Sequence, residues 1–170
     1  LCDGFWAQSL LKLFKKEAVL LPGPDFFRNS ILADEGLRNC ILGSSEKVQM
    51  GLKKYLIRNG FNGVLYDYPI PFAGLEDFDY KSIAREMYSR SIDIVWISLG
   101  APKQEYFLKR LRKELSRDYP NYTVSLVAIG AAIDFYSDSG AVSRAPTFLR
   151  SMGMEWLWRM FRQPSKTFKR

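Results

Sequence analysis

Three side chains of types that bind ligands or take part in reactions follow a buried strand predicted at residues 92–99. After Gly100 and a proline, Lys103, Gln104 and Glu105 open the next predicted helix. A helix N-terminus carries partial positive charge, so the dipole alone explains Glu105, whereas the cation of Lys103 opposes it. Lys103 therefore indicates an anionic ligand, and a solvated lysine is the alternative.

Two other turns after predicted strands also carry polar groups. Gly43-Ser44-Ser45 offers backbone N–H groups, hydroxyls and a helix dipole to a phosphate, although it can equally be an ordinary N-cap. Asp134 follows Gly130 by four residues and can bind sugar hydroxyls or act as a base, unless it only forms a turn. In parallel sheets ligands bind beyond the carboxyl ends of the strands. We therefore expect Gly43, Gly100 and Gly130 to lie along one rim.

The composition excludes several kinds of site. The chain has 170 residues and no histidine, which rules out Ser-His-Asp triads, Cys-His pairs and His-ligated metals. General-base chemistry then falls to carboxylates. Cys2 and Cys40 are too few for a disulfide framework or a thiolate metal site, and this count is typical of a reducing compartment. Asp77-Phe78-Asp79 resembles a metal-binding DxD, but Asp79 directly precedes a helix and is better interpreted as its N-cap.

Alternation of strands and helices predicts the fold. Apolar runs that end in glycine predict buried parallel strands, and apolar residues at helical spacing predict the helices between them. This pattern indicates an α/β class: a Rossmann-like, mostly parallel sheet flanked by helices, with residues 1–143 as the core. The predicted strands are 39–42, 92–99 and 124–129, and the predicted helices are 5–16, 25–33, 46–58, 80–89 and 103–117.

The charge surplus lies at the C-terminus. The net charge is +7, and residues 141–170 hold seven basic residues and one acidic residue. We interpret residues 144–170 as a basic, aromatic helical appendage that docks on an anionic membrane surface, each basic residue adding about 1 kcal/mol. The alternative is a helix packed on the core with its arginines at a solvated edge. Its apolar face comprises Met154, Leu157, Trp158 and Phe161, beside Arg159 and Arg162.

Six motifs together carry a resemblance to a known family. In order and spacing they are similar to the WecG/TagA/CpsF glycosyltransferases over essentially the whole chain. The motifs are Asp3-Gly4, Gly23-Pro24-Asp25, Gly100-Ala101-Pro102-Lys103-Gln104-Glu105, Gly130-Ala131-Ala132-Ile133-Asp134-Phe135, Arg144-Ala145-Pro146 and Glu155-Trp156-Leu157-Trp158-Arg159.

The resemblance implies a reaction. An N-acetylmannosamine-type sugar would move, with inversion, from a UDP donor to a polyprenyl-diphosphate-linked sugar. Such products feed bacterial teichoic acid, common antigen or capsule synthesis, so the resemblance implies a cytoplasmic protein that is peripheral on the inner face of the cell membrane. The UDP-sugar is a substrate, and no metal or other cofactor is expected.

The resemblance also implies residue roles. Asp3 would be the general base, and Gln104 would line the donor or acceptor pocket. Arg144, Arg159 and Arg162 would offset the charge of the diphosphates in place of a metal. We expect the donor side of the site also to include Gly43, Ser44, Gly100, Lys103, Glu105 and Asp134.

Departures from the family pattern keep other functions open. Leu20 and Lys166 stand where the family usually has arginine, and the chain starts two residues before Asp3, where relatives carry a further strand-helix unit. An inactive family member that serves as a binding subunit is therefore one alternative. A basic nucleic-acid-binding module is another, but it leaves the motif around Gln104 unexplained, so no nucleic-acid partner is expected. The C-terminal aromatic residues also leave room for a homo-oligomer interface.

Overall fold

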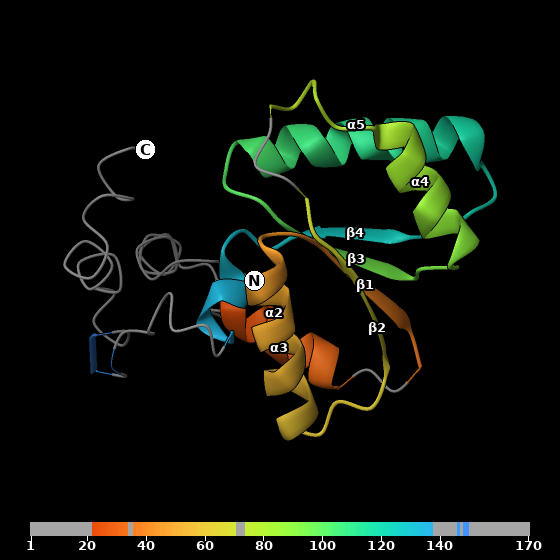
Figure 1. Cartoon of the computed structure of the whole chain (residues 1–170). Coiled ribbons are helices and arrows are strands. Elements are labelled where there is room, and N and C mark those ends of the chain that lie inside the picture. The colour runs from red at the N-terminus through yellow and green to blue at the C-terminus, as the bar shows by residue number, and fades with distance from the viewer. Residues whose placement is uncertain (1–21, 34–35, 71–73, 138–145, 147, 150–170) are drawn as a thin grey trace, which may run out of the picture.

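The computed structural model describes residues 22–33, 36–70, 74–137, 146 and 148–149. These residues form four parallel strands in the order β2-β1-β3-β4, as the α/β prediction requires. Helices follow the strands in the chain (Figure 1). The strands are β1 (Arg38–Gly43), β2 (Val64–Tyr68), β3 (Ile94–Ser98) and β4 (Ser125–Ala128), and the helices are α2 (Gly23–Leu32), α3 (Glu46–Arg58), α4 (Tyr80–Ser89), α5 (Lys103–Asp118) and the 3-10 helix η1 (Ala132–Phe135).

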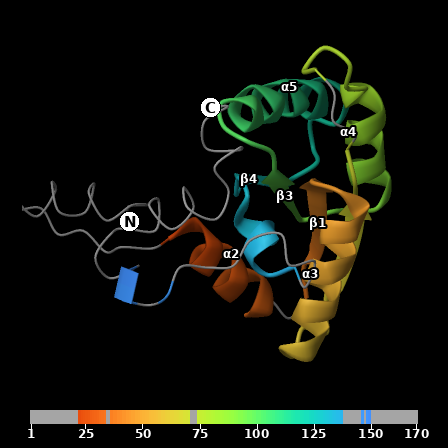
Figure 2. The ribbon, with the colours of Figure 1, turned by 60° about the vertical axis from the view of Figure 1, so that its left-hand side comes forward.

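The sheet lies between two helical layers. α4 and α5 cover one face, whereas α2, α3 and η1 cover the other, as Figures 1 and 2 show from two sides. Successive side chains of a strand point to opposite faces. Along β3, Val95 and Ile97 therefore pack under α4 and α5, and Trp96 between them packs against the other layer. Burial on both faces explains why the central strands are continuous apolar runs.

Most predicted elements are confirmed, with shifts at their ends. Helices 46–58 and 80–89 match α3 and α4 residue for residue, and α5 is one residue longer than the helix expected at 103–117. The predicted strands 92–99 and 124–129 are shorter in the structure. The helix predicted at 5–16 and the appendage at 144–170 lie outside the described residues, apart from 146 and 148–149. The division at residue 143 stays a prediction.

The sequence analysis missed β2. This strand carries a charge, Asp67, and its residues are at most half-buried because it is an edge strand of the described sheet. Burial raises the pKa of the Asp67 carboxyl, and the Lys53 ammonium, 3.8 Å away on α3, acts in the opposite direction. A half-buried edge strand does not produce the uninterrupted apolar run that marks the central strands.

Side chains define where two helices begin. The Asp79 carboxylate accepts a hydrogen bond from the backbone N–H of Ser82 at 3.0 Å, which confirms its interpretation as an N-cap. Ser45 caps α3 by accepting from the N–H of Val48.

The Cys40 thiol is buried in the core, and this burial raises its pKa to about 12. Cys40 thus has the role of a small apolar core residue.

No helix among the described residues combines the length and apolar character needed to cross a membrane.

A buried, hydrogen-bonded pair of side chains joins the neighbouring strands β1 and β3. The indole N–H of Trp96 donates to the side-chain oxygen of Asn39 at 2.8 Å, and the Asn39 amide donates to the carbonyl of Leu37 at 3.1 Å. Asn39 is fully buried and Trp96 is 2% exposed. The pair satisfies two polar groups that the hydrophobic layer on this face would otherwise leave without partners.

The end of β1 requires a glycine. Gly43 has a φ of 105°, and a Cβ built there would lie 2.6 Å from the carbonyl oxygen of Ser98 on β3. Gly60, which follows α3, has a similar φ of 89°, but nothing lies within 4 Å of its Cβ position. Both glycines adopt a conformation that L-residues disfavour, and only Gly43 also permits a close approach of two strands.

We predict that Asn39→Leu lowers the free energy of unfolding by about 1–3 kcal/mol, because the buried Trp96 indole loses its acceptor. Urea unfolding followed by tryptophan fluorescence measures the change. Asn62→Ala at an exposed position is the matched control and should stay within about 0.5 kcal/mol of wild type. Equal midpoints for the two variants would contradict the role assigned to the pair.

We predict that Gly43→Ala is more destabilising than Gly60→Ala. Both variants carry the cost of a left-handed L-residue, about 1–2 kcal/mol. Gly43→Ala adds a steric cost of about 1–3 kcal/mol because its new methyl group meets the Ser98 carbonyl. The difference between the unfolding free energies of the two variants measures the steric cost of the close approach between Gly43 and Ser98. Equal losses of stability in the two variants would show that the strand ends can move apart at no cost.

Candidate functional site

The carboxyl ends of three strands meet at one edge of the sheet. Gly43 pairs in register with Ser98, and Ile97 pairs with Ala128, so β1, β3 and β4 end side by side. The turns after these strands contain Gly43, Gly100 and Gly130, and the structure therefore brings together the three glycines that the sequence placed on a rim. We call these turns, 43–45, 99–102 and 129–131, the rim.

The β1–α3 turn is held from below by a glutamine that the sequence analysis missed. The side-chain amide of Gln49 donates to the carbonyls of Ile41 and Gly43. Gln49 is 1% exposed, although it is polar and lies one turn into α3. Its spacing from Leu52 and Leu56, at i+3 and i+7, was the available signal, because it places an amide on the buried face of the helix.

The β1–α3 turn also has an unusual backbone conformation. Ser44 has a φ of 62°, which non-glycine residues rarely adopt, and Ser45 then caps α3. The N-terminus of α3 therefore opens at the rim, and helix N-termini favour anions. Gly43 and Ser44 lie where the sequence placed a phosphate contact.

Gln104 joins two turns of the rim. Its side-chain oxygen accepts a hydrogen bond from the backbone N–H of Gly130 at 2.9 Å, and its amide nitrogen donates to the Glu105 carboxylate at 2.9 Å. The hydroxyl of Ser98, a residue that the sequence analysis did not single out, donates to the Gly130 carbonyl at 2.8 Å. Gln104 and Glu105 thus lie in the first turn of α5 next to the rim, where Gln104 hydrogen-bonds to Glu105 and to the backbone of Gly130, and their contact with substrate stays a prediction.

Lys103 has a structural partner that the sequence did not reveal. Its ammonium lies 5.0 Å from the centre of the Phe78 ring, a cation–π distance. Phe78 belongs to the core cluster under α4 and α5. This contact explains why a lysine stands at the start of a helix even without an anionic ligand. The position of Lys103 is therefore no longer by itself a sign of such a ligand.

Asp134 lies in η1, just past the Gly130 turn. It is partly buried, and η1 is anchored by Ile133, which is fully buried. The neighbouring Tyr136 hydroxyl donates to the Asp25 carboxylate at 3.3 Å, which ties the Gly23-Pro24-Asp25 motif of α2 to η1. Two separate motifs of the sequence therefore meet on the α2–α3 side of the sheet.

Aromatic and charged side chains extend this contact. The Arg28 guanidinium donates to the Tyr55 hydroxyl at 2.8 Å, and the Tyr55 ring lies 5.1 Å from that of Tyr136. The hydrogen bond to Tyr55 raises the pKa of Arg28, and the charge of Asp25 adds to this. The cluster links α2, α3 and η1 beside the rim.

The remaining predicted site residues lie outside the described residues. They are Asp3, Arg144, Arg159 and Arg162, together with the atypical Leu20.

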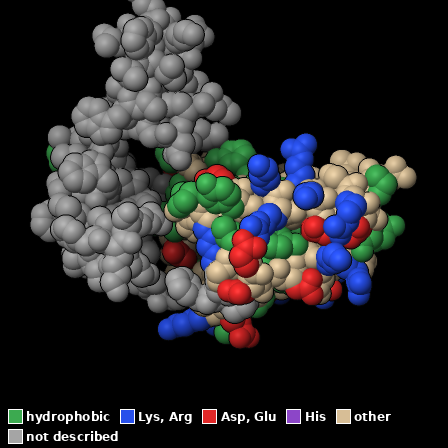
Figure 3. Space-filling model, turned by 90° about the horizontal axis from the view of Figure 1, so that it is seen from above, with side chains coloured by type: hydrophobic (Ala, Val, Ile, Leu, Met, Phe, Trp, Pro, Cys, Tyr) green, Lys and Arg blue, Asp and Glu red, His purple; other side chains and the backbone are tan. Residues whose placement is uncertain are grey.

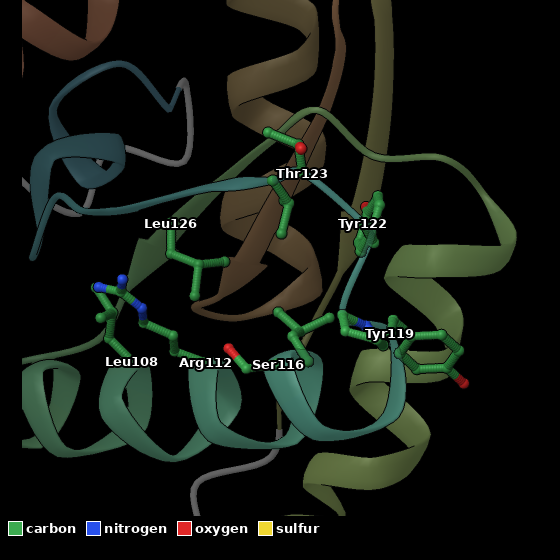
Figure 4. Close-up of a pocket in the computed structure, with 10 residues that line it drawn as sticks. Leu108, Arg112, Ser116, Tyr119, Tyr122, Thr123 and Leu126 are labelled. Atoms are coloured by element: carbon green, nitrogen blue, oxygen red, sulfur yellow. The ribbon is translucent and has the colours of Figure 1, made fainter.

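A separate hollow of about 460 Å³ lies between α5 and β4. Figure 4 shows Leu108, Arg112 and Ser116 of α5 facing Leu126 of β4 across it. The hollow continues to Tyr119 and Tyr122, near the start of β4 and the end of α5, so it lies on the flank of the sheet rather than at the rim. The outer surface over α4 and α5 carries lysines and arginines interspersed with acidic side chains (Figure 3), as on an ordinary solvated face.

Comparison with known proteins gives the family. The chain matches the sequence model of the glycosyl transferase WecG/TagA/CpsF family over residues 1–170. It is also 30% identical over 120 residues to an N-acetylglucosaminyldiphosphoundecaprenol N-acetyl-beta-D-mannosaminyltransferase of Bacillus spizizenii, an alignment that covers 68% of this chain and 44% of the relative. A protein of the same name from Bacillus subtilis is 30% identical over 118 residues, covering 67% and 43%.

The chain therefore spans less than half the length of these relatives. The family match nevertheless covers every residue, including the motifs around Gln104 and Asp134 that the structure brings to the rim. The chain belongs to the WecG/TagA/CpsF family of glycosyltransferases.

Proposed function

We propose that this protein is an inverting glycosyltransferase. It transfers an N-acetylmannosamine-type sugar from a UDP donor to a polyprenyl-diphosphate-linked sugar in the synthesis of a bacterial surface polysaccharide. The observation that carries the proposal is the family match over residues 1–170, since the two named relatives are N-acetylmannosaminyltransferases. The convergence of the family's central motifs at one rim supports it further.

The donor diphosphate binds at the rim. The α3 N-terminus supplies a positive dipole and N–H groups, and Gly43 leaves room for the β1–α3 turn to pack closely on β3. Gly100, in the turn after β3, and Lys103, the first residue of α5, contribute to the same donor site, and Asp134 offers a carboxylate to sugar hydroxyls from η1. Arg144, Arg159 and Arg162 supply the cations that offset the charge of the leaving diphosphate.

The reaction is a single displacement at the anomeric carbon. The acceptor hydroxyl oxygen forms a bond to that carbon while the bond to the β-phosphate oxygen breaks, so UDP leaves and the configuration inverts. The Asp3 carboxylate takes the proton of the attacking hydroxyl. Because the chain contains no histidine, a carboxylate is the natural base near neutral pH.

The acceptor determines where the protein acts. A polyprenyl-diphosphate substrate is held in a membrane, and the basic, aromatic residues 144–170 are suited to an anionic lipid surface. We therefore propose a peripheral protein on the inner face of the cytoplasmic membrane, with room for self-association through its C-terminal aromatic residues.

We predict that Asp3→Asn lowers the transfer rate by about 10²–10⁴-fold, because the amide cannot accept the hydroxyl proton. The assay measures UDP release from UDP-N-acetylmannosamine in the presence of a lipid-linked N-acetylglucosaminyl diphosphate. It uses the protein expressed with whatever sequence its gene places on either side of residues 1–170.

The matched control for this assay is Asp118→Asn. Asp118 is exposed at the far end of α5, where it pairs with Arg117, so its removal should leave the rate unchanged. Wild-type turnover that survives Asp3→Asn would exclude Asp3 as the base. A wild type that binds UDP-sugar without turnover would instead indicate a binding subunit.

We predict that transfer persists in excess EDTA, because arginines rather than a divalent cation offset the diphosphate charge. The measurement is the initial rate before and after dialysis against the chelator, with and without added Mg²⁺. Loss of activity that Mg²⁺ restores would refute this part of the proposal.

A further inference from the structure

Both backbone polar groups of Gly130, its N–H and its carbonyl, hydrogen-bond to side chains from other elements. The Gly130 N–H donates to Gln104 on α5 at 2.9 Å, and the Gly130 carbonyl accepts from the Ser98 hydroxyl of β3 at 2.8 Å. The sequence separations are 26 and 32 residues. The glycine has a φ of 55°, and Ser98 is 7% exposed. We call Ser98 and Gln104 the Gly130 clamp.

We propose that the Gly130 clamp positions the β4–η1 turn for catalysis, so that Ser98 and Gln104 act through Gly130 and neither residue needs to touch the substrate. This inference rests on the proposed transferase function. It assigns a role to Ser98, and it replaces direct substrate contact by Gln104 with a positioning role.

The donor and acceptor pattern of Gln104 supports this assignment. A backbone N–H can only donate, so the atom of Gln104 that faces Gly130 is the side-chain oxygen. The amide nitrogen then faces the Glu105 carboxylate, which accepts its hydrogen. A neutral side chain with an acceptor on one side and a donor on the other is required here, and among side chains of this length only glutamine provides both.

The clamp controls the path of the chain beyond Gly130. Directly after this glycine the backbone enters η1, whose bonds run from Ala132 N–H to the Ile129 carbonyl and from Asp134 N–H to the Ala131 carbonyl. Ile133 anchors η1 in the core on the α2–α3 side. The turn is thus fixed at the rim by the clamp and in the core by Ile133, and Asp134 directly follows Ile133 in η1.

An exchange of residues 104 and 105 separates positioning from direct contact. In the double variant Gln104→Glu/Glu105→Gln, a carboxylate at position 104 still accepts from the Gly130 N–H, and the new amide at position 105 donates to that carboxylate. Both hydrogen bonds persist while position 104 loses its N–H donor. A glutamine that donates to substrate cannot be replaced in this way, whereas a clamp can.

The first measurement is hydrogen exchange at the Gly130 amide, which does not depend on activity. We expect Gln104→Met to accelerate this exchange on the order of tenfold, because the N–H loses its acceptor, and the double variant to restore protection. Circular dichroism melting verifies that each variant is folded. Exchange that is unchanged in folded Gln104→Met would overturn the clamp.

The second measurement is the transfer rate. We expect Gln104→Met and Ser98→Ala each to lower kcat by about 10- to 100-fold, as a displaced active-site turn does. The double variant should recover at least about tenfold of the loss in Gln104→Met. Ser125→Ala, an exposed serine at the start of β4, is the control for Ser98→Ala and should retain wild-type kcat.

The outcomes distinguish the two proposals. A double variant that restores protection of the Gly130 amide but stays as inactive as Gln104→Met would show that the Gln104 amide or the Glu105 carboxylate contacts substrate, and would overturn the role of Gln104 as a residue that acts only through Gly130. A wild-type protein without transferase activity would instead count against the proposed function, while the exchange measurement still tests the clamp.

Discussion

The close approach of β1 and β3 at their carboxyl ends is the constraint on which the rim depends. The backbone oxygen of Ser98 lies only 2.6 Å from the place that a Cβ on Gly43 would take, and the Ser98 hydroxyl donates to the carbonyl of Gly130. One residue of the central strand therefore contacts both neighbouring turns, one through its backbone and one through its side chain. If β1 moved away from β3, the α3 N-terminus and the Gly130 turn would no longer be held in a fixed position relative to each other.

The layers beneath the rim make that constraint rigid. Gln49 on α3 fixes the carbonyls at the end of β1, and Ile133 fixes η1 in the same core. The polar pair between Trp96 and Asn39 joins β3 to β1 further down the sheet. The amide nitrogen of Gln49 and the Trp96–Asn39 pair are buried and hydrogen-bonded, whereas the side-chain oxygen of Gln49 has no hydrogen-bond partner among the described residues. Buried hydrogen bonds of this kind specify one arrangement of strands more strongly than apolar packing does. The turns to which we assign the donor diphosphate are thereby connected to buried elements of the core.

The fold could be predicted largely from sequence because its signals are local. Apolar runs and helical spacing located the helices α2 to α5 and the strands β1, β3 and β4, whereas β2 was not predicted because an edge strand with Asp67 has no continuous apolar run. The contacts within the site are not local. Lys103 meets Phe78, and Ser98 and Gln104 meet Gly130, only because of the sheet order and register, which no spacing along the chain encodes. Sequence could indicate the right turns, but it could not show which side chains join them.

The charge balance at the rim bears on how the family reaction is achieved. A departing diphosphate needs positive charge nearby, and the described rim offers mainly helix N-termini, whose dipoles act as partial charges. Lys103 is the cation that sequence assigned to this place, and it packs on the Phe78 ring. Lys47 lies exposed in the first turn of α3, and the family motifs would add Arg144 and Arg159, which lie outside the described residues. In that arrangement the described core would supply shape, helix dipoles and the lysines at the helix N-termini, and the basic C-terminal residues would add further positive charge.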